Sequence, residues 1–355
     1  MKRKPHVLVA PLHWGLGHAT RCIPIINELL KQGFLVSLAS DGAALALLQN
    51  TFPELPSHEL PSYQVTYSKS AAGFAYKLAQ QLPHFWKTMQ NEQKWLTDYT
   101  LKNQIDGIIS DNRPGLFHAK IPSVYVTHQL QIKAGIWGIL ASNAHQKLIN
   151  RFHACWVPDV SNNGGLSGAL GHTRTHRIHI PTAYIGPLSR LKKLHFGVEK
   201  GFILAVLSGP EPQRTLLENK LLSWTPPFES KAILIQGIPN KSSEKQINGW
   251  QVIPFAQAEE LAELMEKAEH LIVRSGYSSL MDLQALGRKA LLLPTPGQPE
   301  QLYLAKYMTQ NNWLPSIDQS LFDGSQLAQI DTFNGIQSAE EATPDWAQLF
   351  TIFRG

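Results

Sequence analysis

Short runs of apolar residues that end in a glycine or serine turn recur along the whole chain. Each run gives way to a helical pattern, as it does after residues 6–10, 105–109, 202–207 and 270–273. Uninterrupted apolar runs are typical of strands that are covered on both faces. Alternation of such strands with helices predicts the α/β class, with parallel sheets whose ligands bind outside the carboxyl ends of the strands.

This alternation divides the 355 residues into two Rossmann-like units. We expect the first unit to span residues 1–187 and the second to span residues 188–340, with the two facing each other across a cleft. Within the last residues, 341–355, the apolar run Pro344–Phe353 predicts a helix that can dock on another element.

The composition narrows the class of partner. A formal charge of +5, from 32 basic and 27 acidic residues, is compatible with an anionic small molecule or an anionic membrane surface. A dedicated nucleic-acid-binding protein would carry a denser basic patch, so no nucleic acid is expected as a partner. Cys22 and Cys155 supply no CxxC pair, which favours a reduced, cytoplasmic setting. No apolar stretch reaches the roughly 18 residues of a membrane-spanning helix.

A glycine-containing turn, residues 15–20, follows the first predicted strand. It begins like the GxGxxG dinucleotide fingerprint, and Asp41 ends the next strand, where an acid could bind a ribose. Thr20 replaces the third glycine, which weakens the interpretation as an NAD site. The turn can instead place His18 as a general base near neutral pH, although a structural role for this histidine stays open.

Two turns of the second unit are suited to hold phosphate groups. Ser208-Gly209 and Ser275-Gly276 each lie between a predicted strand and a predicted helix. Backbone N–H groups and the positive end of the helix dipole attract an anion at such a turn. Arg274 adjoins one turn and Arg214 follows the other, but each could equally be an ordinary packing or surface residue.

Side chains near these turns could bind a sugar. Asp282 lies three residues after Ser279, which is the spacing of a capping box, so its carboxylate could cap the helix or reach a ligand. Glu300 and Gln301 lie in a polar loop after a strand and could hydrogen-bond sugar hydroxyls, or the loop could simply cap a helix.

Several catalytic motifs are missing from the sequence. It contains no DxD pair, no HExxH motif, no Walker lysine loop and no GxSxG elbow. Metal-dependent hydrolysis, P-loop phosphoryl transfer and the usual serine hydrolysis therefore lose support, and we expect no metal site.

The C-terminal half, roughly residues 188–330, resembles glycosyltransferase family 28. The resemblance rests on Arg274-Ser275-Gly276 running through Asp282 to Gly287, and on Leu291–Pro294 followed by Glu300–Tyr303. This family includes the N-acetylglucosaminyltransferase that makes the peptidoglycan lipid intermediate. The resemblance implies the GT-B fold, which has two Rossmann-like domains, a donor nucleotide sugar in the C-terminal one and a last helix that returns to the N-terminal one.

By position, the resemblance assigns donor-binding roles to the second unit. Asp282 would meet the ribose where the family usually has a glutamate, and Phe255-Ala256 would recognise uracil. Leu302 stands where the family commonly has the second residue of a glutamine pair, so the sugar stays unassigned. The expected donor-binding residues are Ser208, Gly209, Arg214, Phe255, Ala256, Arg274, Ser275, Gly276, Tyr277, Ser278, Asp282, Glu300 and Gln301.

The resemblance implies transfer of a hexose or N-acetylhexosamine from a UDP-sugar to a hydroxyl acceptor, such as a glycolipid or a cell-envelope glycan precursor. Transfer would be inverting and would need no metal or other cofactor. His18 matches the histidine of the family's acceptor loop, and His18, Asp111 or His128 would take the acceptor proton. A UDP-sugar epimerase on the same fold and a non-catalytic nucleotide-sugar-binding protein are the alternatives.

The apolar segment from residue 132 to residue 156 also contains basic residues, Lys133, Lys147 and Arg151. It predicts either a buried helix or a surface helix that touches lipid or an amphipathic acceptor. The second interpretation is compatible with a peripheral position on the inner face of the cytoplasmic membrane and with a lipid-linked acceptor.

Overall fold

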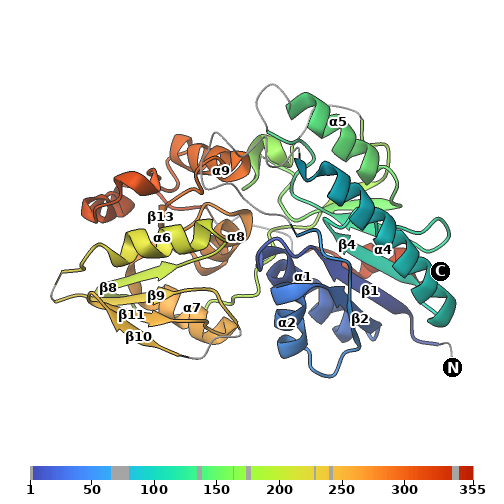
Figure 1. Ribbon diagram of the computed structural model, residues 1–355, viewed down its shortest axis with the longest axis horizontal. Helices are drawn as coiled ribbons and strands as arrows, with labels where there is room; N and C mark the ends of the chain where they lie inside the picture. The colour runs from blue at the N-terminus through green and yellow to red at the C-terminus, as the bar shows by residue number, and fades with distance from the viewer. Residues whose placement is uncertain are drawn as a thin grey trace. The chain divides into compact units, whose positions relative to one another are not determined.

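The computed structural model describes residues 3–64, 80–133, 138–162, 164–172, 177–227, 229–239, 243–337 and 344–354. These residues fall into two compact units (Figure 1). Unit 1 comprises the described residues up to 188 together with 344–354, and unit 2 comprises those from 189 to 337. The predicted α/β class with two Rossmann-like units is confirmed.

Unit 1 is built on a parallel sheet with strand order β3-β2-β1-β4-β5-β6-β7. Its strands are β1 His6–Pro11, β2 Leu35–Ser40, β3 Ser57–Glu59, β4 Gly107–Asp111, β5 Ser123–Val126, β6 Ala154–Val157 and β7 Thr182–Tyr184. Its helices are α1 Gly17–Lys31, α2 Gly42–Thr51, α4 Leu82–Lys102, α5 Gly138–Ile149, the 3₁₀ helix η2 Gly168–Leu170, and the C-terminal α10 Trp346–Leu349 and η5 Phe350–Phe353.

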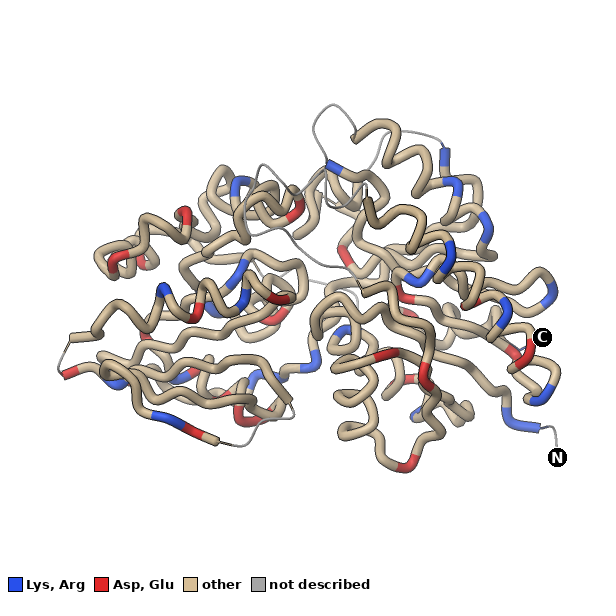
Figure 2. The backbone as a smooth tube through the Cα atoms, viewed as in Figure 1, with Lys and Arg blue, Asp and Glu red and all other residues tan. Residues whose placement is uncertain are grey.

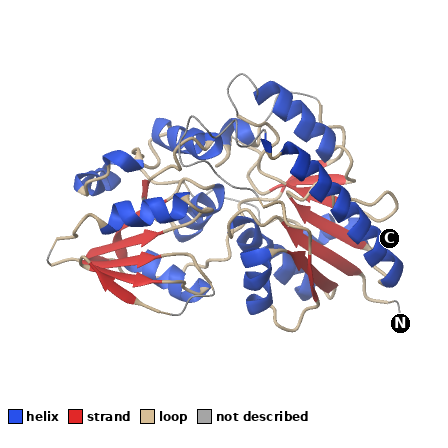
Figure 3. Ribbon diagram, viewed as in Figure 1, coloured by secondary structure: helices blue, strands red, loops and turns tan. Residues whose placement is uncertain are grey.

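Unit 2 has strand order β10-β11-β9-β8-β12-β13, in which β10 is antiparallel and the other strands are parallel (Figure 3). Its strands are β8 Glu199–Val206, β9 Lys231–Ile235, β10 Lys245–Ile247, β11 Trp250–Ile253, β12 Ala268–Val273 and β13 Leu291–Leu292. Its helices are α6 Gln213–Leu222, α7 Ala258–Lys267, α8 Tyr277–Leu286, α9 Pro299–Gln310, and the 3₁₀ helices η3 Gln319–Leu321 and η4 Ser325–Thr332.

Each sheet contains a point where the direction of the chain's crossovers reverses. In unit 1 the chain leaves β1 towards β2 and later returns to the other side of β1 as β4. In unit 2 it leaves β8 towards β9 and returns to the other side of β8 as β12. The turns that follow these two strand pairs diverge, and the resulting space at the carboxyl edge is where open α/β sheets bind ligands.

The apolar cores explain why the strand runs are uninterrupted. In unit 1, Leu8 of β1 and Ile108 of β4 pack with Leu96 of α4, and all three are fully or almost fully buried. In unit 2, Leu234 of β9 and Leu217 of α6 belong to the corresponding cluster. Helices cover the central strands, so their side chains meet little water and need no polar alternation, whereas the edge strands β3, β7 and β10 are at least partly exposed.

The start of α8 differs from the prediction. The helix begins at Tyr277 with Gly276 as its N-cap residue, so Ser279 lies inside the helix and the capping-box interpretation is wrong. The Asp282 carboxylate instead accepts a hydrogen bond from Ser189 Oγ at 2.5 Å, which ties the helix to the first residue of unit 2.

The C-terminal segment packs within unit 1. The helix expected over residues 344–353 begins at Trp346 and tightens into a 3₁₀ turn. The Trp156 ring lies 6.1 Å from the rings of both Phe350 and Phe353, centroid to centroid. A Cβ atom on Gly107, at the start of β4, would overlap the Phe353 ring. The segment therefore closes an apolar surface over two strands.

We predict that Phe353→Ala destabilises unit 1 by about 3–5 kcal/mol, because the ring is almost fully buried. Gly107→Ala alone should cost roughly 1–3 kcal/mol through overpacking against that ring. In the double variant the smaller residue makes room for the new methyl group, so its loss of unfolding free energy should be smaller than the sum of the two. Urea unfolding followed by tryptophan fluorescence measures all three, and strict additivity would argue against the described packing.

Candidate functional site

At the carboxyl edge of the unit 1 sheet, a histidine and an aspartate form a pair. Gly15 turns the chain with φ of 79°, and α1 then begins at Gly17, which places His18 in its first turn. Asp111 ends β4, next to β1. His18 Nδ1 lies 2.7 Å from Asp111 Oδ1, and the His18 side chain is 12% exposed whereas that of Asp111 is fully buried. The structure thus brings together two residues that the sequence predicted as candidate bases.

Arg21, one turn further along α1, joins this pair to His128. Its side chain is 1% exposed. Arg21 Nε donates to Asp111 Oδ2 at 2.5 Å, and Nη2 donates to the other carboxylate oxygen. Arg21 Nη1 lies 2.9 Å from His128 Nδ1. No sequence motif pointed to Arg21, although it lies three residues after His18 in the same helix, at a spacing that puts the two side chains side by side.

The charges of this cluster decide which groups are ionised. Burial opposes ionisation of Asp111, but Arg21 and then His18 hold the pKa of Asp111 well below its ordinary value. Burial and the Arg21 charge lower the pKa of His18, against the opposing effect of Asp111. Asp111 is therefore a carboxylate with little basicity, and His18 is a neutral imidazole near neutral pH.

A second buried network lies beside the first. The Asp41 carboxylate accepts a hydrogen bond from Arg113 Nη1 at 2.7 Å and lies 3.2 Å from His13 Nδ1. Arg113 Nε also donates to Glu92 Oε1 at 2.6 Å. Asp41 is thus bound to side chains of its own unit, which corrects the interpretation of this acid as a ribose-binding residue.

In unit 2, the two predicted phosphate turns lie beside each other. Ser208-Gly209 follows β8 and Ser275-Gly276 follows β12, and these strands are neighbours. A Cβ atom on Gly209 would meet no atom within 4 Å. A Cβ atom on Gly276 would meet nothing closer than the Gln301 and Ser279 side chains at 4.0 Å. There is consequently space over both turns, and one of them is the N-cap of α8.

The Arg274 side chain does not lie in this space. It is fully buried and donates to the backbone oxygens of Leu293 at 2.9 Å and Gln213 at 2.9 Å. Burial lowers the pKa of Arg274 to about 10. The prediction that Arg274 helps to seat a phosphate is corrected, because its guanidinium holds neighbouring loops together in the interior.

Other predicted donor residues are also held by protein contacts. Arg214 Nε donates to Glu211 Oε1 at 2.7 Å and its Nη1 donates to Glu218 Oε2 at 2.6 Å, so two carboxylates offset its charge. Ser275 Oγ donates to the backbone oxygen of Gln301 at 2.8 Å. The Gln301 side-chain oxygen accepts from the Thr295 backbone N–H at 2.9 Å. These contacts fix the shape of the turns.

The other residues expected to bind the donor lie after β11 and at the starts of α8 and α9. Phe255, after β11, is half-buried, and the Arg190 guanidinium carbon lies 5.8 Å from its ring centroid. Ala256 is almost fully buried, as is Tyr277, whereas Ser278 and Glu300 are partly exposed in the first turns of α8 and α9.

Asp282 occupies a special environment on α8. Although part of the residue reaches the surface, burial of its carboxyl group raises the pKa to about 6, against the lowering effects of Ser189 and Arg190. The folded protein therefore binds a proton at Asp282 more tightly than the unfolded chain does, and the stability that this contributes is lost as the pH rises from about 4 through about 6.

We predict that Asp282→Asn removes this pH dependence, because asparagine keeps the neutral state at every pH. The unfolding free energy of the variant minus that of the wild type should therefore increase as the pH rises from about 4 to about 7. Urea unfolding at several pH values measures the difference. A difference that stays constant with pH would contradict the environment described for this carboxyl group.

Two negative findings concern the described residues alone. They contain no group of three or more His, Cys, Asp or Glu side chains that could hold a metal ion. None of their helices is long and apolar enough to cross a membrane.

Comparison with known proteins identifies both the domain and the fold. Residues 228–336 match the glycosyltransferase family 28 C-terminal domain. None of the curated proteins compared with the chain matches it. The glycotransferase of kitacinnamycin has a similar structure, with a TM-score of 0.62 and 14% identity over 99% of this chain and 95% of that one.

Two further solved structures extend this likeness. MurG of Acinetobacter baumannii has a TM-score of 0.54 and 15% identity over 99% of both chains. UGT89C1 of Arabidopsis thaliana, complexed with UDP-L-rhamnose, has a TM-score of 0.60 and 14% identity over 99% of this chain and 94% of that one. The chain thus has a family 28-like C-terminal domain and the GT-B fold, and these two findings together support its interpretation as a glycosyltransferase.

Proposed function

We propose that this protein transfers a hexose or N-acetylhexosamine from a UDP-sugar to a hydroxyl acceptor, with inversion and without an obligatory metal. The observation that carries the proposal is the His18–Asp111 pair at the carboxyl edge of the unit 1 sheet. A neutral histidine held by a buried carboxylate is suited to take a proton from a hydroxyl group.

Unit 2 is proposed to bind the donor. The N-cap of α8 is Gly276, which brings no side-chain oxygen of its own, and the positive end of the helix dipole favours a diphosphate there. Among the solved structures of similar fold, UGT89C1 is complexed with UDP-L-rhamnose and VinC with dTDP, which supports a nucleotide-sugar donor for this chain. Phe255 and Ala256 are proposed to recognise the base, and Asp282 the ribose.

The proposed reaction is a single displacement. His18 Nε2 takes the acceptor's hydroxyl proton while the acceptor oxygen forms a bond to the anomeric carbon of the sugar. The bond from that carbon to the diphosphate oxygen breaks, and UDP leaves with its electron pair. Asp111 stabilises the imidazolium that forms, and the α8 dipole stabilises the charge on the departing diphosphate. Attack opposite the leaving group inverts the anomeric configuration.

We predict that Gly276→Asp weakens UDP binding at least about tenfold, a loss of roughly 1.4 kcal/mol. The new carboxylate would repel the diphosphate and compete for the helix N-terminus. Aspartate is a favourable N-cap residue, so the stability of unit 2 should be unchanged or slightly higher. Gly276→Ala is the matched control, because its methyl group meets nothing closer than 4.0 Å. Equal UDP affinity of the two variants by calorimetry would place the diphosphate elsewhere.

We predict that His18→Ala lowers sugar transfer by about 10²- to 10⁴-fold and leaves UDP affinity unchanged. UDP release from UDP-N-acetylglucosamine in the presence of a panel of hydroxyl acceptors measures the turnover. His58→Ala, on β3 of the same unit, is the control and should retain activity. If His18→Ala kept full turnover, His18 would not be the base. Isomerised UDP-sugar without acceptor would indicate an epimerase, and UDP binding without release would indicate a binding protein.

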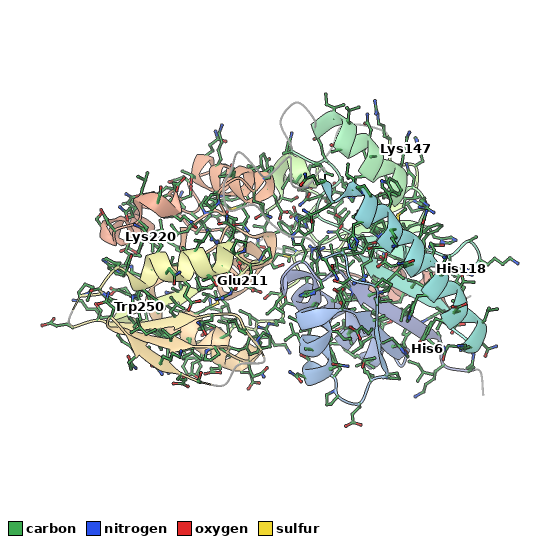
Figure 4. The ribbon with its side chains drawn as sticks, viewed as in Figure 1. His6, His118, Lys147, Glu211, Lys220 and Trp250 are labelled. Atoms are coloured by element: carbon green, nitrogen blue, oxygen red, sulfur yellow. The ribbon has the colours of Figure 1, made fainter. Side chains whose placement is uncertain are left out.

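We further propose that unit 1 touches an anionic membrane surface through α5, which fits a lipid-linked acceptor. The helix is not buried on all sides. Ile139 and Leu140 are 69% and 61% exposed, and Lys147 lies exposed on the same helix (Figure 4). Lys and Arg residues also outnumber acidic ones along α4 and α5 (Figure 2). Exposed apolar residues with neighbouring cations are typical of helices that lie on lipid.

We predict that Ile139→Glu/Leu140→Glu reduces co-sedimentation of the protein with phosphatidylglycerol vesicles. Leu321→Glu is the control, because Leu321 is apolar and 65% exposed but belongs to unit 2. Vesicles of phosphatidylcholine alone should bind the wild type less well, because they offer no net negative charge. Unaltered sedimentation of the double variant would argue against α5 as the contact.

A further inference from the structure

Arg21 contacts the three candidate bases, His18, Asp111 and His128, at the carboxyl edge of unit 1. It bonds to both oxygens of Asp111, and it lies 2.9 Å from the Nδ1 atoms of both His18 and His128. We infer that Arg21 is a positioning residue: it fixes the tautomer of His128, with the proton on Nε2, and it holds the Asp111 carboxylate that fixes the tautomer of His18, with the proton on Nδ1. The role in catalysis that follows from this rests on the proposed function.

The tautomer of His128 follows from the chemistry of arginine. A guanidinium has only N–H donors and is never deprotonated in proteins. His128 Nδ1 must therefore accept from Arg21 Nη1 through its lone pair, and the proton of the neutral ring lies on Nε2. A protonated His128 would set one N–H against another. The Gln129 side-chain nitrogen lies 3.5 Å from His128 Nε2, and this longer contact is weaker than the 2.9 Å contact with Arg21, which therefore decides the tautomer. His128 thus presents an N–H at Nε2 and does not serve as the base.

The tautomer of His18 follows from its shorter contact. Its Nδ1 lies 2.7 Å from Asp111 Oδ1 and 2.9 Å from Arg21 Nη2. Without a proton on Nδ1, two lone pairs would face each other at 2.7 Å, one of them on a carboxylate. With a proton there, His18 donates to Asp111 while Arg21 keeps both of its bonds to that carboxylate, and the 2.9 Å approach of Arg21 Nη2 to His18 Nδ1 is then a contact between two donors that share Asp111 as their acceptor. The lone pair on His18 Nε2 is then available to take the proton of the hydroxyl group that receives the sugar.

Arg21 also sets the strength of this base. The charged and titratable groups that face His18 are Arg21 on the same helix, Asp111 at the end of β4 and His128 after β5. Cys22 Sγ approaches only Asp111, at 3.6 Å. Because Arg21 offsets the Asp111 charge, the imidazolium form of His18 gains less from its carboxylate partner than it would in an isolated pair. His18 therefore stays neutral, and able to accept a proton, at lower pH.

Long-range ¹H–¹⁵N NMR of the full chain labelled with ¹⁵N-histidine tests this inference directly. In the wild type near neutral pH we expect His128 protonated only on Nε2 and His18 protonated only on Nδ1. Arg21→Lys keeps the positive charge but loses the planar guanidinium, whose separate N–H groups contact Asp111 and His128 together, so His128 should populate both tautomers. Arg21→Met removes the charge, so the midpoint of the His18 titration should move to higher pH.

Arg113→Lys is the matched control, because Arg113 is equally buried in unit 1 and is bonded to two carboxylates of the second network. It should leave the His18 and His128 signals unchanged. A wild-type His128 with its proton on Nδ1 would overturn the inference even if no Arg21 variant folds. So would Arg21 variants that fold and leave both tautomers unchanged.

The catalytic consequence has its own readout. In Arg21→Met, the acid limb of the pH profile of UDP release should shift to higher pH, and turnover at neutral pH should fall by about 10²-fold. A purely structural loss would lower turnover without shifting the acid limb. The NMR measurement needs no substrate. Expected tautomers without any UDP release would contradict the proposed function alone, whereas UDP release with the opposite tautomers would contradict the inference alone.

Discussion

Parallel strand pairing is the constraint on which both units depend. A chain that adds a parallel strand must cross back over the sheet, so the carboxyl ends of all parallel strands gather at one edge. In unit 1 the carboxyl ends of β1, β4 and β5 meet there: His18 lies in the helix that follows β1, Asp111 ends β4 and His128 follows β5. In unit 2 the turns after β8 and β12 meet in the same way. Side chains far apart in the sequence become neighbours through this geometry alone.

Two buried arginines of unit 1 are paired with buried carboxylates. Arg21 is bonded to Asp111, and Arg113 lies between Asp41 and Glu92. A charge removed from water is costly unless partners and hydrogen bonds compensate it, and buried pairs add little net stability. Their value here lies in orientation, because each pair holds a histidine at the rim of the sheet.

The sequence was sufficient to predict the α/β class, the two Rossmann-like units and the edge at which the functional turns lie. Apolar runs and glycine turns are local signals, and they identified the β12–α8 turn and the turn that precedes His18. The start of α8 was predicted wrongly, because the spacing of Ser279 and Asp282 fits a capping box equally well in a register that begins three residues later.

The contacts that define the site were beyond reach of sequence patterns. Arg21 and Arg274 occupy ordinary positions in the sequence. In the fold, Arg21 is bonded to Asp111, 90 residues away, and Arg274 is bonded to Gln213, 61 residues away. His18 and Asp111 were each expected at strand ends, but their contact spans 93 residues. Such pairings depend on strand order and register, which a single sequence does not specify.

The position of the C-terminal segment has a consequence for how the two units are connected. The chain leaves unit 1 after Leu188 and belongs to it again from Pro344 onwards. Unit 1 is therefore discontinuous, and no single cut divides the molecule into two complete parts. A fragment that ends at Leu188 would leave Trp156 without the rings of Phe350 and Phe353, and would expose to water an apolar surface that the intact chain covers with its own last residues.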